Sequence, residues 1–89
     1  MARFEILIKR SAAKEIQAIP RKKDRQRIVR KIRQLAEDPR PPGSQKLSGR
    51  ERYRIRQGPY RIVYSIEDDR LIVYVVKVEH RSDVYRGPL

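Results

Sequence analysis

Residues 53–64 restrict the fold of this chain more than any other stretch. Apolar and polar side chains alternate through residues 53–56, pause at residues 57–59, and alternate again from residue 60. Successive side chains of a strand point to opposite faces, so the pattern predicts a β-hairpin with one apolar face. That face carries Tyr53, Ile55, Tyr60, Ile62 and Tyr64. The opposite face gathers Arg54, Arg56 and Arg61, and we expect the functional site there.

The N-terminal half predicts one strand and two helices. Apolar residues at every second position predict a strand over residues 3–8. A short helix follows over residues 12–19, with Ser11 as its N-cap. Pro20 suits the first position of a second helix that runs to about Glu37. Its apolar stripe is formed by Ile28, Ile32 and Leu35.

The C-terminal half completes the sheet. Three prolines between residues 38 and 43 exclude a helix and predict a stiff connection into the hairpin. Residues 71–78 are apolar on both faces, which predicts a central strand that is covered on both sides. The order β-α-α-β-β-β predicts an α+β fold, with two N-terminal helices packed on a mostly antiparallel sheet and residues 1–89 as one domain. The tyrosines in apolar phase, Tyr53, Tyr60, Tyr64 and Tyr74, are expected in the core.

Charge is the bulk property that bears most on function. The 89 residues carry a formal net charge of +12, which favours a polyanionic partner, nucleic acid first. A basic surface kept only for solubility is the alternative, although solubility needs much less charge. The absence of Cys and the single His exclude disulfides, thiolate zinc sites and multi-histidine metal sites. No apolar run approaches membrane-spanning length, so we expect a cytoplasmic protein without a metal or other cofactor.

Several basic residues outside the hairpin are candidates for RNA contact. Arg30 and Lys31 lie on the basic face of the second predicted helix, and Lys46 precedes the hairpin. The simplest interpretation of each is a solvated side chain, and direct contact with nucleic acid is the alternative.

The ordered motifs resemble one known family. Residues 46–49 (Lys-Leu-Ser-Gly), 53–56 (Tyr-Arg-Ile-Arg), 60–64 (Tyr-Arg-Ile-Val-Tyr) and 78–85 follow two helices in a small basic chain, and this pattern resembles the RelE/ParE superfamily of bacterial toxins. The resemblance spans nearly the whole chain. It implies a toxin of a type II toxin–antitoxin system, namely a RelE-like endoribonuclease that cleaves mRNA in the ribosomal A site by attack of the RNA's own 2′-OH. The implied partners are a cognate antitoxin, the ribosome with its rRNA and mRNA, and operator DNA only through the antitoxin.

The family's catalytic positions carry over to Arg54, Arg56, Arg61, Arg81 and Tyr85. In the best-known member, lysines occupy the positions of Arg54 and Arg56. Arginine keeps the electrostatic role but cannot serve as a base, because it does not lose its proton near neutral pH.

Proton transfer therefore needs another residue. His80 precedes Arg81 and is the only histidine, the side-chain type that titrates near neutral pH, so it is our candidate. Regular strand alternation would separate His80 from Arg81, but a strand that ends near Val78 releases them from that rule. Tyr85 has two interpretations: it stacks on a base, or it packs the C-terminal segment onto the sheet.

Two other functions stay open at this point. A ParE-like DNA gyrase poison would share the fold without RNase activity, and a non-catalytic RNA-binding protein would share the charge. The arginine cluster with His80, Arg81 and Tyr85 favours the enzyme.

Overall fold

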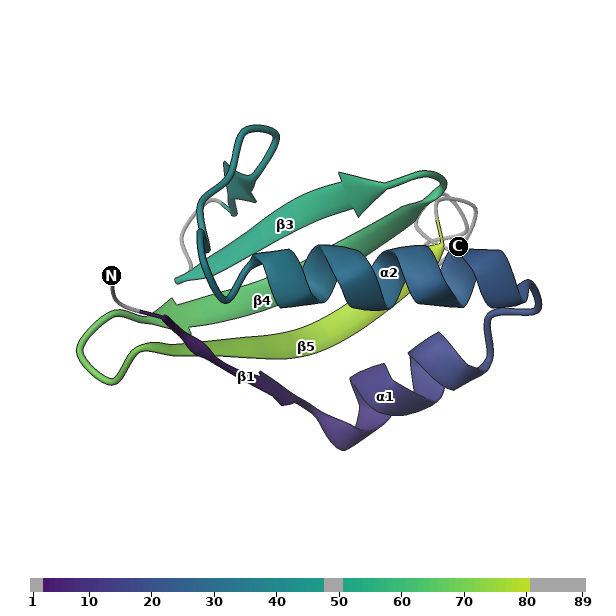
Figure 1. The fold of residues 1–89 in the computed structure, drawn as a ribbon, viewed down its shortest axis with the longest axis horizontal. Helices are drawn as coiled ribbons and strands as arrows, with labels where there is room; N and C mark the ends of the chain where they lie inside the picture. Colours follow the sequence, from purple (N-terminus) through teal and green to yellow (C-terminus); the bar gives the residue numbers. More distant parts are fainter. Residues whose placement is uncertain (1–2, 48–50, 81–89) are drawn as a thin grey trace, which may run out of the picture.

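A computed structural model describes residues 3–47 and 51–80 of the chain, as two helices packed on one face of a five-stranded sheet (Figure 1). The elements follow the order β1 (Glu5–Ile8), α1 (Arg10–Gln17), α2 (Lys22–Gln34), β2 (Gln45–Lys46), β3 (Arg52–Gln57), β4 (Tyr60–Glu67) and β5 (Ile72–His80). The predicted α+β architecture is confirmed. The two-residue strand β2 is an addition that the sequence patterns did not predict.

The sheet has the strand order β1-β5-β4-β3-β2, and only the β1–β5 pair among these strands is parallel. The predicted hairpin is confirmed as β3 and β4, with Ile55 opposite Ile62 and Arg56 opposite Arg61. Gly58 in its turn has a φ of +58°, a left-handed conformation that glycine adopts without steric cost.

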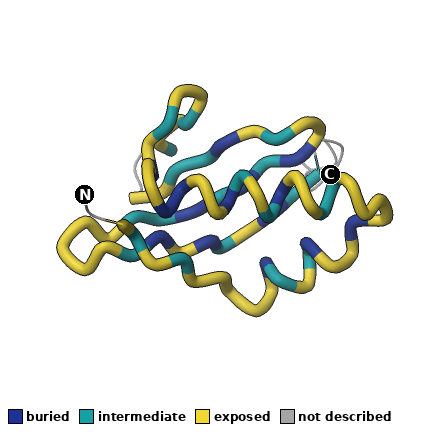
Figure 2. The backbone as a smooth tube through the Cα atoms, viewed as in Figure 1, coloured by how far each residue is buried: buried dark blue, intermediate teal, exposed yellow. Residues whose placement is uncertain are grey.

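The core lies between the helices and the sheet, and the outer surfaces are largely exposed (Figure 2). α1 packs on β5, and α2 packs on β3 and β4. The predicted stripe of α2 is buried, as are the inward tyrosines Tyr60 and Tyr64, whereas Tyr53 is half-buried. The largest fully buried side chains are Tyr64, Ile28, Ile32, Leu35, Ile62, Val73 and Val75.

One irregularity in β5 changes which side chains face the helices. The β4–β5 register pairs Val63 with Lys77 but Tyr64 with Val75, so Val76 is an extra residue in the manner of a β-bulge. In a regular strand Tyr74 would share the face of Val78. The bulge instead puts Val75 on that face and leaves Tyr74 38% exposed on the other. The expectations of a core Tyr74 and of a strand covered on both faces are therefore wrong.

The helix boundaries also differ from the predicted ones. Lys9, not Ser11, is the N-cap of α1, because the Lys9 N–H still donates to Val75 O (2.9 Å) while its C=O already accepts from Ala13 N. Strand and helix therefore meet without a spacer, and Ser11 lies inside the first turn. Arg21 is the N-cap of α2, so Pro20 lies in the linker and not at the first helical position.

The C-terminal end of α2 tightens before it stops. The amides of Leu35, Ala36 and Glu37 donate to carbonyls three residues earlier, at 3.0, 3.1 and 3.2 Å. Hydrogen bonds of this spacing form a 3₁₀-type turn. The regular α-helix ends at Gln34, and this turn continues the helical path to the predicted end near Glu37.

Residues 38–44 are anchored to the sheet by side chains. The buried Tyr64 hydroxyl donates to Pro39 O (2.7 Å), and burial raises the pKa of Tyr64 to about 12. Arg40 donates from Nη1 and Nη2 to the Asp68 carboxylate (3.1 and 2.9 Å) and from Nε to the Tyr53 hydroxyl (3.1 Å). The hydrogen bond from Arg40 holds the pKa of Asp68 below its usual range. The connection is thus fixed where it delivers β2 to the sheet edge.

Candidate functional site

Arg54, Arg56 and Arg61 lie together on the sheet face that the helices leave open. Their strand neighbours Ile55 and Ile62 are buried on the helix side, so the alternation of β3 and β4 turns the three arginines outward. Together with Gly43 and Gln45 they line a pocket of about 370 Å³. The predicted clustering of these three arginines is present in the structure.

Among the described residues, no ion pair includes an arginine of this pocket, although the register places Glu79 opposite Arg61. Within residues 3–47 and 51–80, the ion pairs are Arg40–Asp68 and Lys46–Glu51, and neither includes a pocket arginine. Arg56 and Arg61 stand directly opposite each other, an arrangement of like charges that costs stability. A bound anion would relieve this repulsion, so the pocket is suited to a phosphate group.

His80 lies at the same end of the sheet as the arginine pocket, but on the other face. β5 continues to His80, so the expectation that the strand ends near Val78 is wrong. The register pairs Arg61 with Glu79 and Tyr60 with His80, and Tyr60 is buried on the helix side. The rings of Tyr60 and His80 meet edge to face at 5.0 Å. The described residues therefore do not bring His80 into the arginine pocket.

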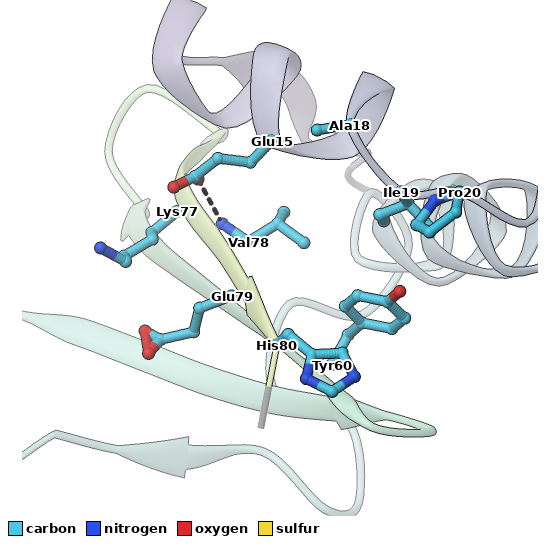
Figure 3. Close-up of a pocket in the computed structure, with 9 residues that line it drawn as sticks. All are labelled: Glu15, Ala18, Ile19, Pro20, Tyr60, Lys77, Val78, Glu79 and His80. Carbon is cyan, nitrogen blue, oxygen red and sulfur yellow. Dashed lines mark hydrogen bonds between the residues drawn. The ribbon is translucent and has the colours of Figure 1, made fainter. Parts of the chain in front are cut away.

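A second pocket, of about 490 Å³, opens between α1 and the end of β5 (Figure 3). His80 and Tyr60 form one side of it, Ile19 and Pro20 another, and Glu15 reaches down from α1. The Val78 N–H donates to Glu15 Oε1 (2.9 Å), an interaction that no sequence pattern predicted. This pocket mixes apolar and aromatic side chains with Glu15, Glu79 and a single lysine, Lys77, which makes it a poorer site for phosphate than the arginine pocket.

The remaining candidate residues lie apart from both pockets or outside the described residues. Arg30 and Lys31 belong to α2, on the covered side of the sheet, where they share a shallow hollow with Gln57. Lys46 pairs with Tyr53 in register and forms an ion pair with Glu51 at 3.6 Å, so it does not share the face of Arg54. Arg81 and Tyr85 lie outside the described residues.

Gln45 is a pocket residue that sequence reasoning missed. Its Oε1 accepts hydrogen bonds from Arg54 Nε (3.1 Å) and Nη2 (2.8 Å). Its place in the pocket follows from the pairing of residue 45 with residue 54, and that pairing requires strand β2, which was not predicted.

Two observations apply to the part of the chain that the structure describes. No group of three or more His, Cys, Asp or Glu side chains there is placed to hold a metal ion. No helix there is both long and apolar enough to cross a bilayer.

The fold is that of several solved α+β proteins, among them chains of toxin–antitoxin complexes. A chain of the complex RelBE2 from Mycobacterium tuberculosis has this fold, with a TM-score of 0.81 and 22% identity over 93% of this chain and 97% of that chain. The isolated Escherichia coli RelE toxin superposes with a TM-score of 0.75 and 30% identity, over 96% of this chain and 93% of that one.

Sequence comparison gives the family. The profile described as ParE toxin of type II toxin-antitoxin system, parDE, matches residues 6–85, and the protein belongs to this family. It is similar to a RelE-like toxin protein of Escherichia coli, with 31% identity over 87 residues that cover 93% of this chain and 90% of that protein. The resemblance inferred from the motifs is confirmed.

Proposed function

We propose that this toxin is a ribosome-dependent endoribonuclease that cleaves mRNA in the A site and so inhibits translation. The observation that carries the proposal is the arginine pocket, in which three guanidinium groups gather on one sheet face and none forms an ion pair with a carboxylate among the described residues. The sequence identity with RelE-type toxins supports the proposed endoribonuclease activity.

The proposed reaction is an in-line attack of a ribose 2′-OH on the adjacent phosphate. The O2′–P bond forms as the P–O5′ bond breaks, the 2′-OH gives up its proton, and the leaving O5′ takes one up. The products are a 2′,3′-cyclic phosphate and a 5′-OH end. The chemistry needs alignment, proton transfer and stabilisation of a phosphorane that is more negative than the ground state. No metal or other cofactor takes part in it.

Arg54, Arg56 and Arg61 supply the electrostatic part of this reaction. Guanidinium groups match phosphate oxygens in a bidentate fork and stay charged, so they stabilise the phosphorane without exchanging a proton. Arg81 is proposed to hold the same phosphate, and Tyr85 to stack on a base of the mRNA. Lys46, Arg30 and Lys31 are proposed to contact RNA phosphates outside the arginine pocket.

His80 remains our candidate for proton transfer, with a geometric condition attached. It lies one register step from Arg61 but on the opposite face, against Tyr60. For His80 to reach a 2′-OH held by the arginines, the RNA must pass around the end of the sheet where β4 begins and β5 ends. Water or Tyr85 is the alternative proton carrier.

The proposed partners are a cognate antitoxin and the ribosome, with contact to operator DNA only through the antitoxin and with action in the cytoplasm. Similar folds occur in complexes with RelB from Escherichia coli and Pyrococcus horikoshii. An acidic antitoxin segment would also offset the charge of +12.

One alternative function has a specific observation in its favour. The matching family profile is that of ParE toxins, and a ParE-like protein would poison DNA gyrase without cutting RNA. A non-catalytic basic RNA-binding protein is the third possibility, and it would explain the charge but not the opposed arginines of the pocket.

One experiment separates these functions. The protein is induced in cells, and mRNA 5′ ends are mapped by primer extension while SOS induction is monitored. New 5′ ends at fixed positions within codons of translated messages support the endoribonuclease. SOS induction with intact mRNA would establish the gyrase poison instead, and the absence of both would leave RNA binding alone.

A further inference from the structure

Arg54 is held by a neutral side chain, unlike the arginine that anchors the neighbouring loop. Gln45 Oε1 accepts from both Nε and Nη2 of Arg54, at 3.1 and 2.8 Å. Arg40, by contrast, donates to the Asp68 carboxylate at 2.9 and 3.1 Å, and its charge is cancelled there. An amide oxygen fixes a guanidinium in space but leaves its full positive charge. Arg54 is therefore oriented without being neutralised.

The position of Gln45 follows from the anchored connection before it. Residues 45 and 54 are directly opposite in the antiparallel β2–β3 pair, so their side chains share one face of the sheet. β2 has only two residues and is exposed, and its place depends on residues 38–44. The Tyr64–Pro39 hydrogen bond and the Arg40–Asp68 pair fix that segment to the sheet. The fold thus delivers the amide to one wall of the arginine pocket.

The two hydrogen bonds occupy one particular edge of the guanidinium. Arginine has five N–H donors in a planar fork, and the Nε–H and one Nη2–H form its side edge. Gln45 takes both of these with a single oxygen. The second Nη2–H and the two Nη1–H groups are left for other acceptors. The end edge formed by Nη1 and Nη2 offers two parallel donors, a geometry that suits two oxygens of one phosphate.

We propose that Gln45 is a positioning residue for the arginine pocket. It holds Arg54 so that the Nη1–Nη2 edge, still fully charged, meets a phosphodiester of the RNA. The inference rests on the proposed endoribonuclease function and adds to it a residue that acts through Arg54. Strand β2, which was not predicted from the sequence, thereby contributes to catalysis by carrying Gln45.

The inference is tested by single-turnover cleavage of A-site mRNA on programmed ribosomes. Gln45→Met removes the acceptor at similar length and keeps every arginine. Freed from its partner, Arg54 regains rotamer freedom, and the loss of pre-alignment is expected to lower the saturated cleavage rate roughly 5- to 30-fold. The toxin concentration for half-saturation should change less than twofold, because the charge is unaltered. Gln26→Met, at an exposed position of α2, is the matched control and should cleave like wild type.

A double-mutant cycle distinguishes positioning from an independent role. If Gln45 acts through Arg54, Gln45→Met should cause no further loss in an Arg54→Ala background. An equal loss in both backgrounds would overturn the inference, as would a Gln45→Met variant that cleaves at the wild-type rate. Gln45→Glu keeps the acceptor but cancels the charge, and it too should slow cleavage; a wild-type rate would refute the role of the neutral amide. Wild-type protein that does not cleave at all would refute the proposed function itself, an outcome distinct from these three.

Discussion

The arginine pocket accounts for the electrostatic part of the proposed reaction but not for the proton transfer. Arg54, Arg56 and Arg61 stay protonated near neutral pH, so the described part of the site supplies electrostatic stabilisation alone. Arg56 and Arg61 stand opposite each other at a cost in stability. The unbound protein therefore already holds these hydrogen-bond donors in position despite their repulsion. Such preorganisation is what transition-state stabilisation requires.

Arg61→Ala is the most direct test of this role. Loss of one preorganised donor should lower the cleavage rate by about 100- to 1000-fold, equivalent to roughly 3–4 kcal/mol of transition-state energy. The thermal midpoint should change little, because the substitution removes both the repulsion with Arg56 and the attraction to Glu79 across the sheet. Growth inhibition in cells and A-site cleavage on ribosomes provide the measurements. Arg27→Ala, on an exposed position of α2, is the control. Cleavage by Arg61→Ala at near the wild-type rate would refute the site assignment.

Tyr64 offers a test of the loop anchor through pH. At neutral pH, Tyr64→Phe should lower the free energy of unfolding by about 1–2 kcal/mol, because Pro39 O loses its buried donor. The pKa of Tyr64 is raised from its usual value near 10 to about 12 by burial. Between these values the unfolded chain releases the phenol proton while the folded protein keeps it, so stability falls as pH rises. The advantage of wild type over Tyr64→Phe should therefore shrink from pH 10 to pH 12 in denaturant titrations. A difference that is constant over this range would contradict the burial of an un-ionised hydroxyl.

The elements show which parts of the fold a sequence can predict. The hairpin and the α2 stripe were predictable because alternation and 3.6-residue spacing are local signals. The alternation also placed the three arginines on one face of the sheet. The bulge at Val76 was not predictable, because the sequence around it has the pattern of a regular strand. The bulge arises only when β5 pairs with β4, and it turns Tyr74 outward. β2 was missed for a related reason, since two residues carry no periodicity and its position depends on the distant Arg40–Asp68 contact.

Glu15 tests how α1 covers the edge of β5. β1 pairs with β5 only as far as Val75, so the Val78 N–H finds its acceptor in the Glu15 carboxylate. Glu15→Ala should leave this amide unsatisfied and lower the free energy of unfolding by about 1–2 kcal/mol, whereas Glu15→Gln retains an acceptor and should cost less. Hydrogen exchange of the Val78 amide should accelerate in Glu15→Ala. Lys14→Ala, at an exposed position of the same helix, is the control. An unchanged exchange rate would contradict the protection of the Val78 amide by Glu15.

The whole molecule combines a small core with a net charge of +12. Self-repulsion of this size destabilises the compact state, and binding to any polyanion relieves it. The two polyanions proposed for this toxin, ribosomal RNA and an acidic antitoxin, would both contact a protein whose charge is spread over the helices as well as the arginine pocket. Association should therefore depend on the total charge, whereas cleavage should depend on the few side chains in the pocket.

Salt separates these two contributions. Each phosphate neutralised on single-stranded RNA should lower log K by about 0.7 per unit of log salt, so the affinity for a single-stranded RNA should decrease steeply between low and physiological salt. The double variant Arg30→Gln/Lys31→Gln on α2 removes two positive charges and should reduce this slope, because both residues are proposed to contact phosphates. It should leave the saturated cleavage rate on ribosomes unchanged, because both residues lie on the covered side of the sheet. Arg61→Ala should show the reverse, a small change in slope and a large loss of rate. Fluorescence titrations over a salt series give the slope, and single-turnover cleavage gives the rate. An affinity that does not vary with salt would remove the electrostatic basis of the proposed RNA binding.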